Sequence, residues 1–256
     1  MPDRFVNTSS IVRKIWGKAD TVLFIFAGAA AEFALNKAVD WLYFTGRLPA
    51  DPLGRLFSTV VYARKIIFSE RDAALMAIDQ ITAIHKDVEK NRGSQIPDWA
   101  YRDVLFLLID YSIRSFELLE RQLSLQEKEE VFDVFNRVGM RMQLQGLPNS
   151  FQEWEIMRKN HLQQNLICSE FSVDLFKKYK EHLGAARYTI VKQVQILLVP
   201  ARVKELLPFA EFSWLAPVLK LYKILRWAKL ESLFRNALLP TAYKIQIKEL
   251  DVSFNN

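Results

Sequence analysis

The longest apolar run of the chain is Thr21–Leu35, TVLFIFAGAAAEFAL, and it indicates a helix. Asp20 stands where it can cap that helix, which we expect to run to about Phe44 and to end at Gly46. The run includes Glu32 and is shorter than the roughly 18–20 apolar residues that a membrane-spanning helix needs. We therefore expect a soluble or peripheral protein.

The composition favours an all-α fold. Half of the 256 residues are hydrophobic, with 18 Phe, 8 Tyr and 6 Trp but only 8 Gly, which is poor turn material for a many-stranded sheet. We predict about 9–11 helices in a single domain over residues 1–256. Beyond the first helix, capping residues and helix-breaking Gly and Pro residues predict the remaining helices. They are expected over Pro52–Phe68, from Ser69 to about Asn91, from Pro97, after the capping boxes Ser124–Glu127 and Ser150–Glu153, over Ser172–Leu183, and over Arg187–Leu207 with a kink near Pro200.

Charge is concentrated in the C-terminal part of the chain. Residues 1–186 carry 24 basic and 24 acidic side chains, whereas residues 187–256 carry 11 basic and 5 acidic ones. This basic segment is also apolar and aromatic, which indicates contact with a membrane surface, and no motif for nucleic acid accompanies it. One cysteine, Cys168, and the lack of a signal-peptide pattern favour a cytoplasmic protein, with membrane association through residues 187–256 left open.

The stretch Ala50–Thr59, ADPLGRLFST, places an arginine and a threonine one helical turn apart. Two interpretations are open for Arg55 and Thr59. The arginine extends to solvent and the threonine bonds back to its own helix, or both groups face an anion in a dry pocket, such as a haem propionate or bound oxygen. Asp51 is expected to be only an N-cap.

His85 is the histidine with the most informative surroundings. Apolar residues flank it at three- and four-residue spacing, so the imidazole is expected to project from an apolar stripe formed by Ala77, Ile78, Ile81, Ile84 and Val88. It is either a core histidine bonded to a backbone carbonyl or the proximal ligand of a haem iron. His161 and His182 have polar neighbours and are expected at the surface, and no zinc motif is present.

These motifs, in this order, resemble the rubber-oxygenase and ER-bound-oxygenase family. The resemblance rests on AGAAAEFAL, DPLGRLFST, ITAIHKDV, LLIDYSIRSFELLERQLSLQEKEEVF and GLPNSFQEW, and spans roughly Val22–Leu162. It implies a helical fold with a globin-like core that binds haem b and uses dioxygen to oxidise isoprenoid or other long unsaturated chains. Arg55 and Thr59 match the family's pair beside the haem, and His85 matches its proximal iron ligand.

The chain departs from the family pattern at several positions. Ser58 stands where some members have a lysine, and three usual family histidines fall on Leu35–Asn36, Thr45–Gly46 and Asp110. Glu32 and Asp40 are the candidates for the general base of the rubber-cleaving members. These departures keep two alternatives open: a non-catalytic helical protein that binds a lipid or a partner, and a haem protein for sensing or peroxidase chemistry.

Overall fold

The predicted all-α class is confirmed. A computed structural model describes residues 3–46 and 50–227, and the side chains of these residues up to Leu221. Over these residues the chain forms eleven helices and no strand, within the predicted number. They are α1 (Ile11–Trp16), α2 (Ala19–Leu35), α3 (Val39–Phe44), α5 (Pro52–Phe68), α6 (Arg71–Arg92), α7 (Asp98–Leu119), α8 (Leu125–Arg141), α9 (Phe151–Gln164), α10 (Glu170–Leu198), α11 (Ala201–Leu206) and α12 (Leu215–Trp227).

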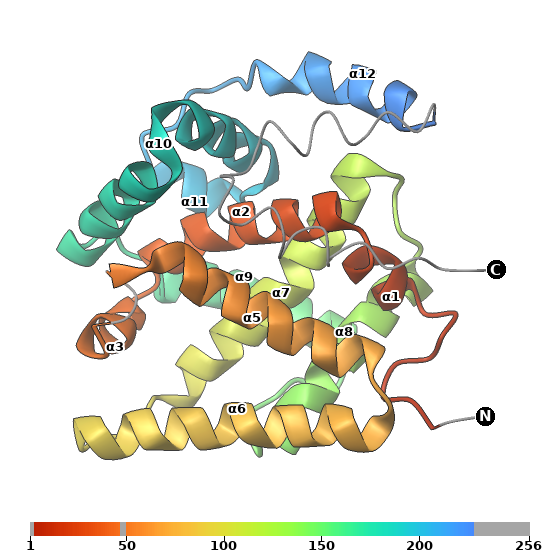
Figure 1. Cartoon of the computed structure of the whole chain (residues 1–256), viewed down its shortest axis with the longest axis vertical. Helices are drawn as coiled ribbons and strands as arrows, with labels where there is room; N and C mark the ends of the chain where they lie inside the picture. The colour runs from red at the N-terminus through yellow and green to blue at the C-terminus, as the bar shows by residue number, and fades with distance from the viewer. Residues whose placement is uncertain (1–2, 47–49, 228–256) are drawn as a thin grey trace.

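The apolar helix α2 lies inside the molecule, with α6 along one edge and α12 along the opposite edge (Figure 1). It packs most extensively on α7 and α10, and most of its residues are buried. Gly28 allows α2 and α7 to approach closely, because a Cβ there would lie 2.3 Å from the ring of Tyr111. The main apolar core extends from α1 into α12, where Leu215 and Leu219 belong to it.

The helix predicted over Thr21–Phe44 is in fact two helices, because the chain turns at Asn36. The Asn36 side chain accepts a hydrogen bond from the Ala38 backbone N–H (2.8 Å) and donates one to Asp103 on α7 (2.8 Å). A short polar side chain that bonds to nearby backbone competes with helical hydrogen bonding. Its partner on α7 then fixes the turn between α2 and α3.

The predicted bounds of α5 are confirmed. Asp51 accepts a hydrogen bond from the Gly54 N–H (2.8 Å), and Pro52 occupies the first turn, where its missing N–H costs nothing. The Ser124–Glu127 capping box is also confirmed, with both reciprocal bonds formed. At the next helix Ser150 caps as predicted, while the Glu153 carboxylate accepts from the backbone of Asn149 instead.

Two predicted boundaries are wrong. The helix predicted from Ser69 begins at Arg71, after a Glu70 that makes no side-chain cap bond. The predicted kink near Pro200 is a break between α10 and α11. The helix end predicted at Gly184 is confirmed in part, because this residue is non-helical (φ 74°, ψ 159°) and two helical segments of α10 meet there across a kink. Within the residues described, no helix combines the length and hydropathy needed to cross a bilayer.

Candidate functional site

The polar residues of the R-x-x-x-T motif face one another on α5. The Arg55 guanidinium donates to the hydroxyls of Ser58 (3.1 Å) and Thr59 (3.4 Å). Both hydroxyls in turn donate to the Arg55 carbonyl, at 2.7 Å from Ser58 and 3.3 Å from Thr59. All three residues are half-buried. The back-bonding considered for Thr59 is therefore present, and it holds the hydroxyl beside the arginine.

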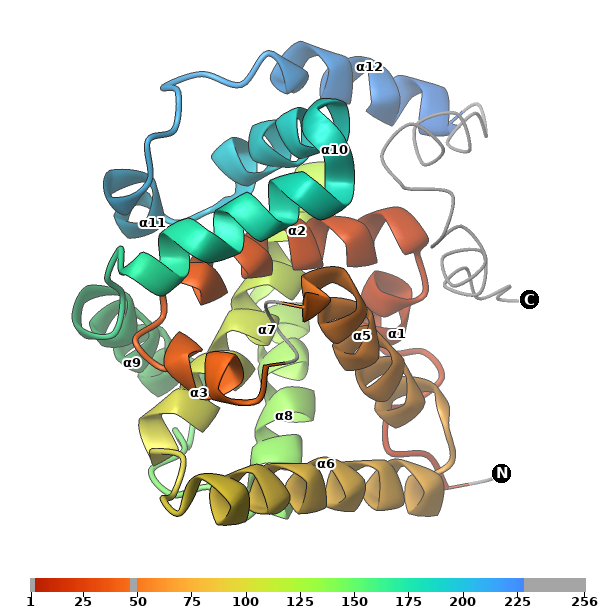
Figure 2. The ribbon, with the colours of Figure 1, turned by 60° about the vertical axis from the view of Figure 1, so that its left-hand side comes forward.

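His85 lies on α6, which packs on α5 (Figure 2). Its Nδ1 is 2.9 Å from the Ile81 carbonyl oxygen, and since a carbonyl only accepts, Nδ1 carries the hydrogen. The Nε2 atom then keeps its lone pair, as a metal-ligating imidazole requires. The half-buried ring also meets the ring of Tyr101 edge-on, with centroids 5.2 Å apart.

The environment of His85 keeps the imidazole neutral. Burial lowers its pKa below the ordinary value, and this effect outweighs the hydrogen bond to the Ile81 carbonyl, which raises the pKa. The charge of Arg55 lowers the pKa further, and that of Glu89 has the smallest effect and raises it. The charge of Arg55 acts on His85, so the two predicted residues, on α5 and α6, lie within electrostatic range of each other. The predicted apolar stripe is correct except at Ile84, which is 42% exposed.

Three residues around His85 were not identified from the sequence. Glu89 accepts from the Tyr101 hydroxyl (3.1 Å), and Arg92 donates to Asp40 on α3 (2.7 Å). Burial and Glu89 raise the pKa of Tyr101, so its hydroxyl remains a donor. Glu89 and Arg92 lie four and seven residues after His85, so helical spacing places them on its face. Tyr101 comes from another helix and carries no such signal.

The two candidates for a general base differ in their surroundings. Glu32 is held by two hydrogen bonds from Arg158, and the two side chains are only 4% and 6% exposed. Its carboxylate also accepts from Tyr111 on α7 (3.1 Å). Asp40 on α3 is half-buried and paired with Arg92, which lies two helical turns after His85 on α6. Of the two, Asp40 is the one that pairs with a residue of α6.

Two further polar residues have side chains that face the inside of the protein. His161, expected at the surface, pairs with Asp103 and stacks on Phe106 with ring centroids 5.0 Å apart. The polar neighbours of His161 along α9 misled the prediction, because its own ring faces α7. Asp110, which stands at a family histidine position, bonds to Arg114 (2.6 Å) and Arg158 (3.0 Å). His182 is exposed, as expected.

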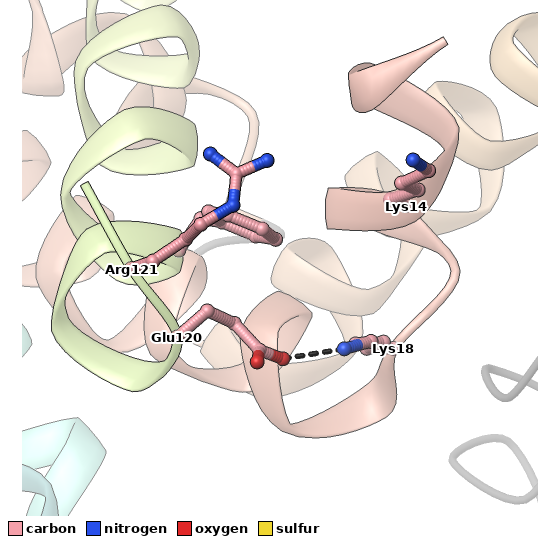
Figure 3. A pocket seen from close by; sticks show the side chains of 5 residues that line it. Lys14, Lys18, Glu120 and Arg121 are labelled. Atoms are coloured by element: carbon pink, nitrogen blue, oxygen red, sulfur yellow. Dashed lines mark hydrogen bonds and ion pairs between the residues drawn. The ribbon is translucent and has the colours of Figure 1, made fainter. Parts of the chain in front are cut away.

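A basic surface pocket lies apart from these residues, between α1 and the end of α7 (Figure 3). Lys18 pairs there with Glu120, and Arg121 pairs with Glu127 through two bonds of 2.7 and 2.8 Å. Lys14 completes the lining cations. Because ion pairs occupy most of its charge, this pocket offers no arrangement for catalysis.

The α5–α6 site offers one imidazole, one guanidinium and two hydroxyls. Among the described residues no group of three or more His, Cys, Asp or Glu side chains is placed to hold a metal. Haem iron needs only one imidazole from the protein, and the cation of Arg55 suits the carboxylates at the edge of a porphyrin. His85, Arg55 and Thr59 are therefore the residues that would hold it.

The comparison with known families gives the class of this all-helical chain, that of an oxygenase catalytic domain. Residues 13–229 match the family described as "ER-bound oxygenase mpaB/B'/Rubber oxygenase, catalytic domain". The match covers most of the chain, so the chain belongs to this family, and the resemblance inferred from its motifs is confirmed. Neither a curated protein nor a solved structure matches the chain significantly.

Proposed function

We propose that this chain is a haem b-dependent oxygenase that uses dioxygen to oxidise a hydrophobic, unsaturated substrate of isoprenoid or long-chain type. Membership of the family supports an oxygenase role in general. The single observation that carries the finer proposal is the hydrogen bond of 2.9 Å between His85 Nδ1 and the Ile81 carbonyl, close to Arg55. Bound haem would supply the oxidising chemistry, and the chain would supply binding, orientation and charge.

His85 would hold the iron through Nε2. The Ile81 carbonyl fixes the tautomer and the ring orientation, which is the usual role of an outer partner of a ligating histidine. The lowered pKa keeps the ring neutral at physiological pH, so no proton has to leave before the iron binds. Tyr101 packs against the ring and limits its rotation.

Arg55 would pair with a haem propionate or with polar oxygen on the substrate side, and Thr59 would hold the guanidinium in place. A charge-assisted bond of this kind is short and strong in a half-buried setting. Ser58, which stands where some family members have a lysine, would leave a bound haem uncovered from this position, because its hydroxyl is committed to the Arg55 carbonyl. Asp40, beside Arg92, is the candidate for the general base.

The absorption spectrum of the purified full-length protein tests the haem proposal. We expect a Soret band that is lost in His85→Ala and kept in His182→Ala, a matched control because His182 is exposed on another helix. Arg55→Met leaves the proposed iron ligand His85 in place but should weaken haem retention. Lys65→Met, on the same helix, should leave haem retention unchanged. A protein that stays colourless and does not take up added haem would contradict the proposal.

A second candidate function is a non-catalytic helical protein that binds lipids or partners. The observation that favours it is Asp110, which takes a family histidine position and is committed to Arg114 and Arg158. Product analysis with unsaturated isoprenoid chains decides between the two. Haem without any oxidised product would instead favour the third alternative, a sensing or peroxidase role.

We also propose peripheral membrane contact through the segment 187–256, of which the structure describes residues up to 227. In this segment Phe212 is 84% exposed and Trp214 is 54% exposed, next to the exposed Lys220. Exposed aromatic and basic side chains together favour the interface of an anionic bilayer. Co-sedimentation with anionic liposomes should decrease in Phe212→Ala and with added salt, while Phe44→Ala, an exposed control outside the segment, should have no effect.

A further inference from the structure

An apolar cavity of about 90 Å³ lies between α2, α5 and α10. The residues of α5 that line it are spaced as one helical face and consist of Leu53, Leu56, Phe57 and Val60. Arg55 and Thr59 project from the opposite face of the same helix, toward α6. The body of α5 therefore separates this cavity from the candidate haem site.

One buried polar group in the cavity wall lacks a partner. Gln195 on α10 is only 2% exposed, and its Nε2 donates to the Ala27 carbonyl on α2 at 3.0 Å. This bond fixes the orientation of the amide, because a carbonyl accepts and cannot donate. The Oε1 atom of Gln195 is buried and makes no hydrogen bond to any part of the chain that the structure describes. An acceptor left in this state is unfavourable, so the cavity favours a ligand that donates to it.

The remaining walls restrict the ligand further. They hold no acidic or basic side chain, and apart from Gln195 their polar groups are the hydroxyls of Tyr179 and Tyr188. A charged ligand would be buried there without a counter-ion, at a high cost.

We propose that this cavity binds a neutral apolar chain that ends in a hydrogen-bond donor, such as a primary alcohol. The hydroxyl donates to Gln195 Oε1, and the carbon chain occupies the space between α5 and α10. The site uses none of the residues assigned to haem, so it goes beyond the proposed oxygenase function and does not depend on it.

Titration of the full-length protein with 1-hexanol and with its isomer 1-methoxypentane, followed by NMR chemical shifts, tests the proposal. The two probes contain the same atoms, but only the alcohol can donate. We expect the alcohol to bind about tenfold more tightly, the usual worth of one well-formed hydrogen bond. Gln195→Met should bind both probes equally, while Gln152→Met, an exposed control on α9, should keep the tenfold preference.

A second variant fills the cavity. Ala30 lines the cavity from α2, and Ala30→Leu should weaken both probes by about tenfold or more without removing Gln195. Equal binding of both probes to the unmodified protein, no binding of either, or an unchanged preference in Gln195→Met would each overturn the proposal. If Gln195→Met does not fold, the comparison of the two probes in the unmodified protein and in Ala30→Leu still decides it.

Discussion

Arg158 on α9 and Glu32 on α2, 126 residues apart in the chain, are joined by two hydrogen bonds of 2.5 and 2.6 Å inside the protein. Arg158 also bonds to Asp110 on α7, so one guanidinium ties three helices together. Burial alone would lower the pKa of Arg158, but the charges of Glu32 and Asp110 outweigh it and hold the pKa above its ordinary value. The buried Glu32 carboxylate thus depends on this one cation, while Asp110 also pairs with Arg114.

Replacing that cation should be costly. Arg158→Met should lower the free energy of unfolding by about 3–5 kcal/mol in urea titrations, because it leaves Glu32 buried and uncompensated and leaves Asp110 with Arg114 as its remaining partner. Adding Glu32→Gln and Asp110→Asn should restore part of the loss. As a control, Arg71→Met breaks an exposed pair with Asp3 and should cost less than about 1 kcal/mol. Equal losses in Arg158→Met and Arg71→Met would contradict the prediction.

The close approach of α2 and α7 predicts a second effect. Gly28→Ala places a Cβ 2.3 Å from the Tyr111 ring, which is fully buried and held through its hydroxyl by Glu32. We expect a loss of about 1–3 kcal/mol in the free energy of unfolding, since the ring has little room to move. Combining Gly28→Ala with Tyr111→Leu should cost less than the sum of the two single changes. Strict additivity would show that the two residues do not clash.

Asp103 secures the turn between α2 and α3. Its Oδ2 accepts from the side-chain amides of Asn36 (2.8 Å) and Asn165 (2.9 Å). Asp103→Asn can keep an oxygen toward these two donors, but it loses the charge that strengthens both bonds and turns its NH2 group toward His161, which pairs with the other carboxylate oxygen, and should cost about 1–3 kcal/mol of stability. Faster hydrogen exchange at the Lys37 amide, which bonds to the Asn165 carbonyl, should accompany the loss. Asp133→Asn, on the exposed side of α8, should change neither measurement.

The lowered pKa of His85 predicts a pH dependence. As the pH falls below about 6.5, the ordinary value for histidine, the unfolded chain binds a proton at this position before the folded protein does. The free energy of unfolding should therefore decrease toward acid, and His85→Phe should reduce that slope. In an NMR titration of the imidazole, Arg55→Met should raise the pKa of His85, because it removes a repelling charge. An unchanged pKa in Arg55→Met would show that burial alone sets it.

Local signals predicted the helices well, and long-range contacts explain where they failed. The bounds of α5 were predictable because Asp51 and Pro52 act within one turn of the helix they begin. The turn at Asn36 was not, because it depends on Asp103, 67 residues away. The burial of His161 has the same cause, since the ring of Phe106 on α7 covers it and its own sequence neighbours are polar.

The candidate site, like the fold, was predictable from the sequence only in part. The spacing of Arg55 and Thr59 shows that they share a face of one helix, and the apolar spacing around His85 shows that it projects inward. That these two faces meet is a property of how α5 packs on α6, which no local pattern contains. The contribution of Tyr101 requires α7 to pass beside α6, so only the folded chain reveals it.

The burial of α2 has a consequence for how this protein unfolds. A helix enclosed by α7, α10 and α5 cannot unwind on its own while its neighbours stay folded. Its amide protons should therefore be the last to exchange with deuterated solvent, and their rate should report the lifetime of the whole folded molecule rather than the motion of any one part.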